Sequence, residues 1–83
     1  MVWRDVEIGT KRVKDLTDKL QKEGFEIAPF ENEKKILYED KPILLYGKDR
    51  IVTFNHLESF PKKRTSKLKE IFREFGLEKY ISI

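Results

Sequence analysis

The segment ILLYGKDRIVTFN, residues 43–55, constrains the fold of this chain more than any other stretch. Residues 43–46 are almost wholly apolar, which is typical of a strand inside a sheet. Residues 46–49 carry a tight-turn signal in which Gly47 would supply a positive φ. Residues 50–55 then return as a second strand. Because a short turn makes its two strands antiparallel, we predict a hairpin with residues 43–46 as the central strand.

The residues on the N-terminal side extend this hairpin into a meander. We expect strands at residues 25–27 and 34–38, with turns at 31–33 and 39–42. Pro29 lacks a backbone N–H, which places the first of these strands at an edge of the sheet.

The two ends of the chain add further candidate strands. Val6 and Ile8 alternate with charged residues, and this period of two predicts a short N-terminal strand. Residues 80–83 either add a last strand or simply dock on the domain.

Two segments have the apolar spacing of amphipathic helices. In the first, residues 10–23, Val13, Leu16 and Leu20 share one face. Thr10 is the expected N-cap because its hydroxyl can accept a first-turn N–H. Gly24 is the expected stop because glycine adopts the left-handed conformation at little cost.

The second helix is predicted over about residues 65–75. Thr65 or Ser66 is expected to cap its start, and Gly76 followed by Leu77 is expected to end it. The fold class is therefore α+β: two helices on one face of an antiparallel sheet, in the order (β)-α-β-β-β-β-α-(β), as a two-layer sandwich. Residues 1–83 form a single domain, since domains usually span about 50–250 residues.

Composition excludes several classes of protein. The chain has 83 residues, 40 % of them charged, and no cysteine, so a disulfide framework and thiolate metal sites are excluded. Apolar runs are only a few residues long, far short of the roughly 20 needed to cross a bilayer. No secretory signal is visible, and we expect a cytoplasmic protein. The many Lys and Glu residues suggest a thermophilic host.

The strongest local feature is a run of bases at residues 62–69. Five bases and no acid occur in these eight residues: Lys62, Lys63, Arg64, Lys67 and Lys69. A helix N-terminus suits a phosphate, and Ser66 and Thr65 add hydroxyl donors. The helix dipole disfavours bases there, which makes the cluster more suggestive of an anionic ligand. The alternative is a solvated, lysine-rich face.

Two stretches resemble the HicA/YcfA family of small toxins: residues 20–27, and residues 50–56 with 67–77. The resemblance implies a double-stranded-RNA-binding-domain-like fold and an RNA-related ancestry. In that family a Gly-Ser-His motif at the start of the second strand supplies the catalytic histidine for RNA cleavage. Counting from Gly24 without gaps, the motif falls on Asn32-Glu33-Lys34. The resemblance therefore carries no catalytic residue onto this chain.

Other candidate sites are weaker. His56 is the only histidine, and no sequence signature supplies a nucleophile or second acid for it. Trp3 and Tyr80 are either core anchors or an exposed stacking platform or interface. The carboxylates Glu31, Glu33, Glu39 and Asp40 are interleaved with lysines that would repel a cation, so we expect no metal and no cofactor.

Three functions follow, in order of preference. The first is a non-enzymatic nucleic-acid-binding module, for RNA or DNA, that contacts phosphates through Lys62, Lys63, Arg64, Lys67 and Lys69, with Ser66 and His56 as further candidates. The second is a protein-interaction domain or a homodimer formed through a sheet edge. The third is a divergent ribonuclease that uses His56.

Overall fold

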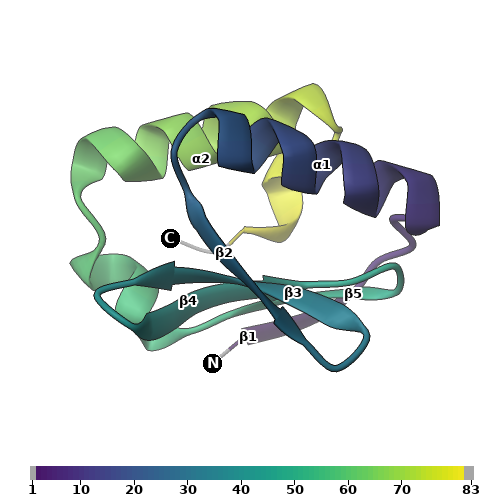
Figure 1. Ribbon diagram of the computed structural model, residues 1–83, viewed down its shortest axis with the longest axis horizontal. Coiled ribbons are helices and arrows are strands. Elements are labelled where there is room, and N and C mark those ends of the chain that lie inside the picture. Colours follow the sequence, from purple (N-terminus) through teal and green to yellow (C-terminus); the bar gives the residue numbers. More distant parts are fainter. Residues whose placement is uncertain (1, 82–83) are drawn as a thin grey trace.

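The computed structural model describes residues 2–81 of the chain (Figure 1). Two helices lie on one face of a five-stranded antiparallel sheet with the strand order β1-β5-β4-β3-β2. The elements are β1 (Val2–Asp5), α1 (Thr10–Lys22), β2 (Glu26–Phe30), β3 (Glu33–Tyr38), β4 (Lys41–Tyr46), β5 (Arg50–Thr53), the 3-10 helix η1 (Asn55–Ser59), α2 (Lys62–Glu74) and the 3-10 helix η2 (Glu78–Tyr80).

This architecture confirms the predicted fold class and element order. The segment 43–46 lies in β4, the middle strand, and β2 with its proline is an edge strand, both as predicted. The alternation near the N-terminus is also confirmed, since Val6 and Ile8 are buried and Glu7 is exposed. No described helix is long and apolar enough to span a bilayer.

The core lies between the helices and the sheet. Its fully buried side chains come from both layers: Leu16, Leu20, Ile36, Ile43, Leu44, Tyr46, Ile51, Leu68, Ile71 and Phe72. Removing each such aliphatic or aromatic side chain from water contributes roughly 1.5–3 kcal/mol. The helical stripes identified in the sequence are therefore the faces that hold the two layers together.

Both predicted helix stops are confirmed. Gly24 and Gly76 have φ of 88° and 71°, in the left-handed region that favours glycine. After each glycine the chain donates back to the last turn, from Phe25 N to Leu20 O at 3.0 Å and from Leu77 N to Phe72 O at 2.8 Å. These bonds satisfy carbonyls that would otherwise lack a partner at the helix end.

Both predicted helix caps are wrong. Gly9 is the N-cap of α1 and Thr10 is its first residue, with no side-chain capping bond. At the second helix Pro61 is the N-cap, and α2 begins at Lys62 rather than Thr65. The N–H of Thr65 already donates to Pro61 O at 2.9 Å, so Thr65 and Ser66 lie beyond the cap. The fixed φ of proline gives the chain a defined entry into this helix.

The sheet turns also differ from expectation. Gly47 does not have the predicted positive φ. Positive φ occurs instead at Glu39 and Asp40, whose φ angles are 51° and 66°. These two residues alone connect β3 to β4, so β4 begins at Lys41. Glycine is required at position 47 for space, because an added Cβ would lie 2.6 Å from Glu33 Cγ.

Two strands end earlier than predicted, and the chain end docks rather than adding a strand over the described residues. The first strand ends at Asp5, and the backbone then continues with Val6 N donating to Asp49 O at 3.1 Å. The strand predicted over 50–55 ends at Thr53, since Asn55 starts η1. At the C-terminus Tyr80 belongs to η2 and Ile81 docks as a buried side chain. Residues 82–83 lie outside the described part of the chain.

Candidate nucleic-acid interface

The two layers of the fold carry opposite net charge. The helix layer, residues 10–23 and 61–81, contains twelve bases and six acids. The sheet layer, residues 2–9 and 24–60, contains six bases and nine acids. The net charge of +3 is therefore the sum of a net charge of +6 on the helix layer and of −3 on the sheet layer. A polyanion is attracted to the helix side of the molecule.

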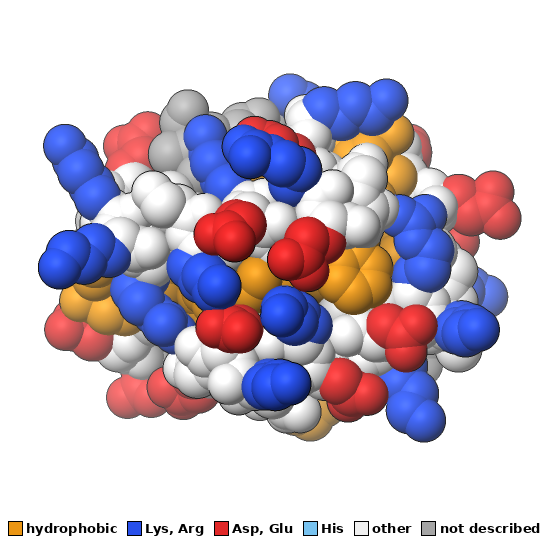
Figure 2. Space-filling model, turned by 90° about the horizontal axis from the view of Figure 1, so that it is seen from above, with side chains coloured by type: hydrophobic (Ala, Val, Ile, Leu, Met, Phe, Trp, Pro, Cys, Tyr) orange, Lys and Arg blue, Asp and Glu red, His pale blue; other side chains and the backbone are white. Residues whose placement is uncertain are grey.

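Within the helix layer the charges are mixed rather than gathered in one block. Figure 2 views this face from above and shows Asp and Glu side chains between Lys and Arg side chains over its middle. A surface able to contact several phosphates is therefore restricted to a row of basic residues within this layer.

One flank of α2 provides such a line. Lys62, Ser66, Lys69 and Arg73 follow one another at intervals of four, three and four residues, which places them on the same side of the helix. Arg64 and Lys67 mark a different side, since both contact Glu23 at the end of α1. The basic flank, as we call the first four residues, thus points away from α1 and contains no acid.

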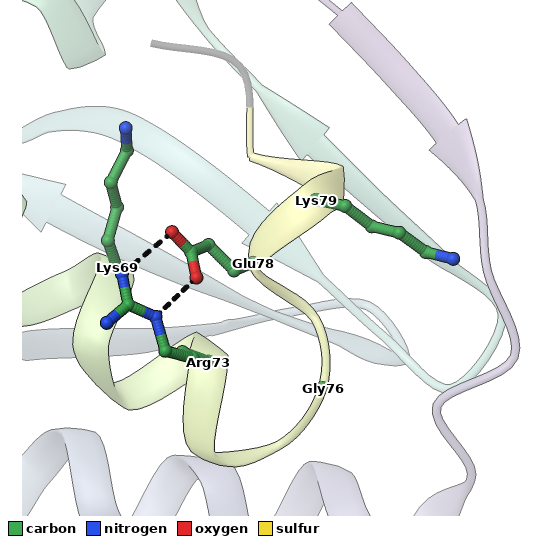
Figure 3. A pocket seen from close by; sticks show the side chains of 5 residues that line it. All are labelled: Lys69, Arg73, Gly76, Glu78 and Lys79. Atoms are coloured by element: carbon green, nitrogen blue, oxygen red, sulfur yellow. Dashed lines mark hydrogen bonds and ion pairs between the residues drawn. The ribbon is translucent and has the colours of Figure 1, made fainter.

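The basic flank ends at a shallow hollow at the C-terminal end of α2. The hollow measures about 520 Å³ and is lined by Lys69, Arg73, Gly76, Glu78 and Lys79. Figure 3 shows Arg73 and Glu78 facing each other while the Lys69 and Lys79 side chains extend away from this pair. Two of the three bases around the hollow, Lys69 and Lys79, therefore lie outside this ion pair.

Glu78 neutralises Arg73 in the free protein. Arg73 donates from Nε to Oε2 at 2.5 Å and from Nη2 to Oε1 at 3.0 Å. These bonds raise the pKa of Arg73 and lower the pKa of Glu78. Two N–H groups on one edge of the guanidinium thus bond two oxygens of one acid. A phosphate can present two oxygens to that edge in the same way.

Two of the predicted site residues have structural partners. The Arg64 guanidinium lies 4.1 Å from the centre of the Phe25 ring and donates to Glu23 O at 3.2 Å. Lys67 Nζ lies 3.5 Å from Oε2 of Glu23, and Lys19 Nζ lies 3.6 Å from Oε1 of the same carboxylate. Arg64 is thus part of the packing between the helices rather than a free cation.

The same contacts explain why bases are tolerated at the start of α2. Bases in the first turn of α2 oppose its dipole, but the C-terminus of α1 lies beside them, as the bond from Arg64 to Glu23 O shows. That end carries about half a negative charge, which offsets the unfavourable interaction. The position of the bases is therefore no sign of a ligand by itself.

The remaining predicted bases are free. Among the described residues Lys62, Lys63 and Lys69 form no ion pair, and Lys62 and Lys63 are exposed. Ser66 is exposed on the basic flank between Lys62 and Lys69. The structure thus keeps Lys62, Lys69 and Ser66 on one surface, with Lys63 on the neighbouring side.

His56 belongs to a different part of the molecule. It lies in η1, is exposed, and its Nδ1 is 3.2 Å from Pro42 O on β4. It shares a hollow of about 50 Å³ with neighbours that include Glu39, Lys41 and Ser59. Sites for small ligands usually measure about 300–1,000 Å³, so this hollow has no room for a nucleotide.

The two terminal aromatics differ from each other. Trp3 is 57 % exposed, which contradicts the view of it as a core anchor. Tyr80 is half-buried against the core, with Lys79 Nζ 5.1 Å from the centre of its ring. They therefore do not form a shared platform of exposed rings.

Two residues of this candidate interface were missed in the sequence, Arg73 and Lys79. Arg73 lies eleven residues after Lys62, on the same side of α2 as Ser66 and Lys69. The sequence contains this spacing, but it becomes informative only with a helix that begins at Lys62. Lys79 joins them because Gly76 turns the chain back beside the last turn of α2. A search of known protein families, of curated proteins and of solved structures found no match for this chain. The resemblance to the HicA/YcfA family therefore stays a prediction.

Proposed function

We propose that the protein is a small non-enzymatic nucleic-acid-binding module whose contact surface is the basic flank of α2 with the adjoining Lys63 and Lys79. The observation that carries the proposal is the line of Lys62, Ser66, Lys69 and Arg73 on the positively charged layer, in which Arg73 is paired with Glu78 while Lys62 and Lys69 form no ion pair among the described residues. RNA is the expected ligand because of the resemblance quoted above.

The spacing of the flank suits a phosphate backbone. A rise of about 1.5 Å per residue separates Lys62 from Lys69 by about 10 Å and Lys69 from Arg73 by about 6 Å along the axis. Long, flexible lysine side chains can reach successive phosphates over such distances. They carry no base-specific geometry, so we expect salt-dependent binding with little sequence preference.

The test is a titration of short single- and double-stranded RNA and DNA at two salt concentrations, followed by chemical-shift changes. The variant Lys62→Glu/Lys69→Glu is compared with Lys11→Glu/Lys14→Glu, which makes the same charge change on the helix layer at exposed positions of α1. Arg64 is left intact because it packs between the helices.

We expect the first variant to bind at least tenfold more weakly and to lower the slope of log K against log salt by about one unit per lysine. The control variant should lose much less. Equal losses in both variants would argue against the basic flank as the site. Absence of binding by the unaltered protein would refute the function itself.

A divergent ribonuclease using His56 stays a prediction with less support, because the hollow beside the ring is small. Its test is direct: RNA cleavage by the unaltered protein that disappears in His56→Ala would establish it.

A further inference from the structure

The sheet face opposite α1 and α2 carries no described helix. Figure 1 shows α1 and α2 on one side of the sheet, and the described residues place no helix on the other side. The large hydrophobic side chains that the structure leaves exposed, Trp3 and Phe30, lie on the edge strands β1 and β2. Trp3 and Phe30 are 57 % and 41 % exposed, respectively.

The strand register defines the surface of this open face. Residues directly opposite one another on neighbouring strands point to the same side of a sheet. One row across all five strands consists of Trp3, Val52, Leu45, Lys35 and Ala28. Leu45 and Val52 are not among the residues packed between the two layers, and each is only 5 % exposed, so neighbouring side chains on this face already shield them from water.

A second row runs beside the first. Asp5 pairs with Arg50 at one edge, and Phe30 pairs with Glu33 at the other. Gly47 lies between them and leaves space for a bond from Arg50 Nε to Glu33 Oε2 at 2.5 Å. The cations also lie near the exposed rings, Arg50 at 5.7 Å from Trp3 and Lys35 at 5.8 Å from Phe30.

We propose that a second copy of this chain docks on the open face, sheet against sheet, about a two-fold axis that runs along the strands above β4. β4 is the middle strand, so such an axis exchanges the two edges of the sheet. It places Leu45 opposite Leu45 of the second copy, and Trp3 opposite Ala28. It also places Arg50 opposite Glu33, in both directions.

Two of these contacts are complementary. The largest exposed ring meets the smallest side chain of its row, and opposite charges face each other. Trp and Arg are also the residues that contribute most to protein interfaces. Because a two-fold interface uses the same surface twice, this self-complementarity favours a second copy over an unrelated protein.

The size of the face limits the area that the dimer can bury. Five strands at about 4.8 Å and five residues at about 3.3 Å cover roughly 24 by 16 Å, or about 400 Å² in projection. A stable interface buries about 800 Å² of accessible surface per partner. We therefore expect a weak dimer, which forms in the micromolar to millimolar range. Nucleic acid is disfavoured here because the sheet layer is net negative.

The proposal is independent of nucleic-acid binding and is tested by sedimentation equilibrium from about 5 µM to 1 mM protein, with the fluorescence of the single tryptophan recorded in parallel. Dimer formation should shift the emission of Trp3 to shorter wavelength as concentration rises. Trp3→Ala and Ala28→Trp should both weaken the dimer at least tenfold, while the exposed control Glu7→Gln, which lies after β1, should not.

A charge exchange identifies the contact between copies. Arg50→Glu alone and Glu33→Arg alone each place like charges across the proposed interface and should be monomeric. Mixed in equal amounts, they present acid against base at both symmetric contacts and should form a heterodimer. Circular dichroism checks that each variant is folded.

Several results would overturn this inference. They are a monomer at 1 mM, a dimer that Trp3→Ala leaves unchanged, as edge-to-edge pairing would, and two folded charge variants that do not associate when mixed.

Discussion

Arg12 and Arg64 occupy equivalent positions and secure opposite ends of the helix pair. Each is the third residue of its helix, and each donates to the backbone carbonyl of the residue that follows the other helix, Arg12 to Phe75 O and Arg64 to Glu23 O. Each acceptor directly precedes a glycine of positive φ. The C-terminal carbonyls of each helix are therefore satisfied by a cation of its antiparallel neighbour.

This relationship predicts a stability role for two surface arginines. Arg64→Ala should lower the free energy of unfolding by about 1–2 kcal/mol, since it removes both a hydrogen bond and the stacking on Phe25. The more exposed Arg12→Ala should cost about 0.5–1 kcal/mol. Urea unfolding measures both, with Lys62→Ala as a control that should change little. An Arg64→Ala protein as stable as the original would contradict the structural role.

Any side chain at position 47 is predicted to destabilise the fold, because Glu33 occupies the space beside Gly47. Gly47→Ala places a Cβ 2.6 Å from Glu33 Cγ and should destabilise the fold by about 1–3 kcal/mol. In a Glu33→Ala background the same substitution should cost clearly less, because the crowding atom is gone. A double-mutant cycle in urea measures this coupling. Equal costs in the two backgrounds would show that space is not the reason for glycine.

The turn between β3 and β4 offers a route to greater stability. Glu39 and Asp40 both have positive φ, which glycine adopts at the least cost and which Asn and Asp tolerate better than other residues do. Asp40→Gly and Glu39→Asn should each increase the free energy of unfolding by about 0.5–1 kcal/mol. Thermal unfolding measures the change as a higher melting temperature. Asn32→Gly is the matched control, since Asn32 lies in a turn but does not have a positive φ. It should stabilise nothing.

Tyr46 predicts how stability changes at alkaline pH. Burial is the largest cause that raises the pKa of Tyr46, from 10.0 to about 12, and its hydroxyl lies 2.5 Å from Thr17 Oγ1. The unfolded chain therefore releases this proton before the folded protein does. Its contribution to stability is complete below pH 10 and is lost between about pH 10 and 12, by up to about 1.4 kcal/mol per pH unit.

Urea unfolding at pH 8–11 measures this dependence, with Tyr46→Phe as the comparison. The difference in stability between the two proteins should change above pH 10, and a constant difference would contradict the assignment.

The ion pair of Glu78 predicts a gain of function. Glu78→Gln removes the charge that neutralises Arg73 beside the hollow. If the basic flank binds phosphates, this variant should bind RNA several-fold more tightly and with a steeper salt dependence. Glu7→Gln makes the same charge change on the sheet side and should have little effect. An affinity that both variants leave unchanged would place the interface elsewhere.

The sequence by itself determined which residues enter the core and where the helices end. Apolar periodicity selected Leu16, Leu20, Leu68 and Phe72, and the glycines stopped each helix, because both signals depend only on neighbours within one turn. The central strand was likewise evident from its apolar run. The cap at Pro61 was missed, and with it the first turn of α2, because the bases that follow it carry no apolar signal.

Only the tertiary structure decided how the charges are used. The five predicted bases fall within eight residues, yet Arg64 and Lys67 turn toward Glu23 whereas Lys62 and Lys69 join Arg73 on the opposite flank. Likewise, Trp3 is exposed because it lies on an edge strand, on the side of the sheet that carries no described helix. Charged and surface side chains take their partners from elements distant in the chain, so local sequence does not specify their roles, whereas packing of the two layers does.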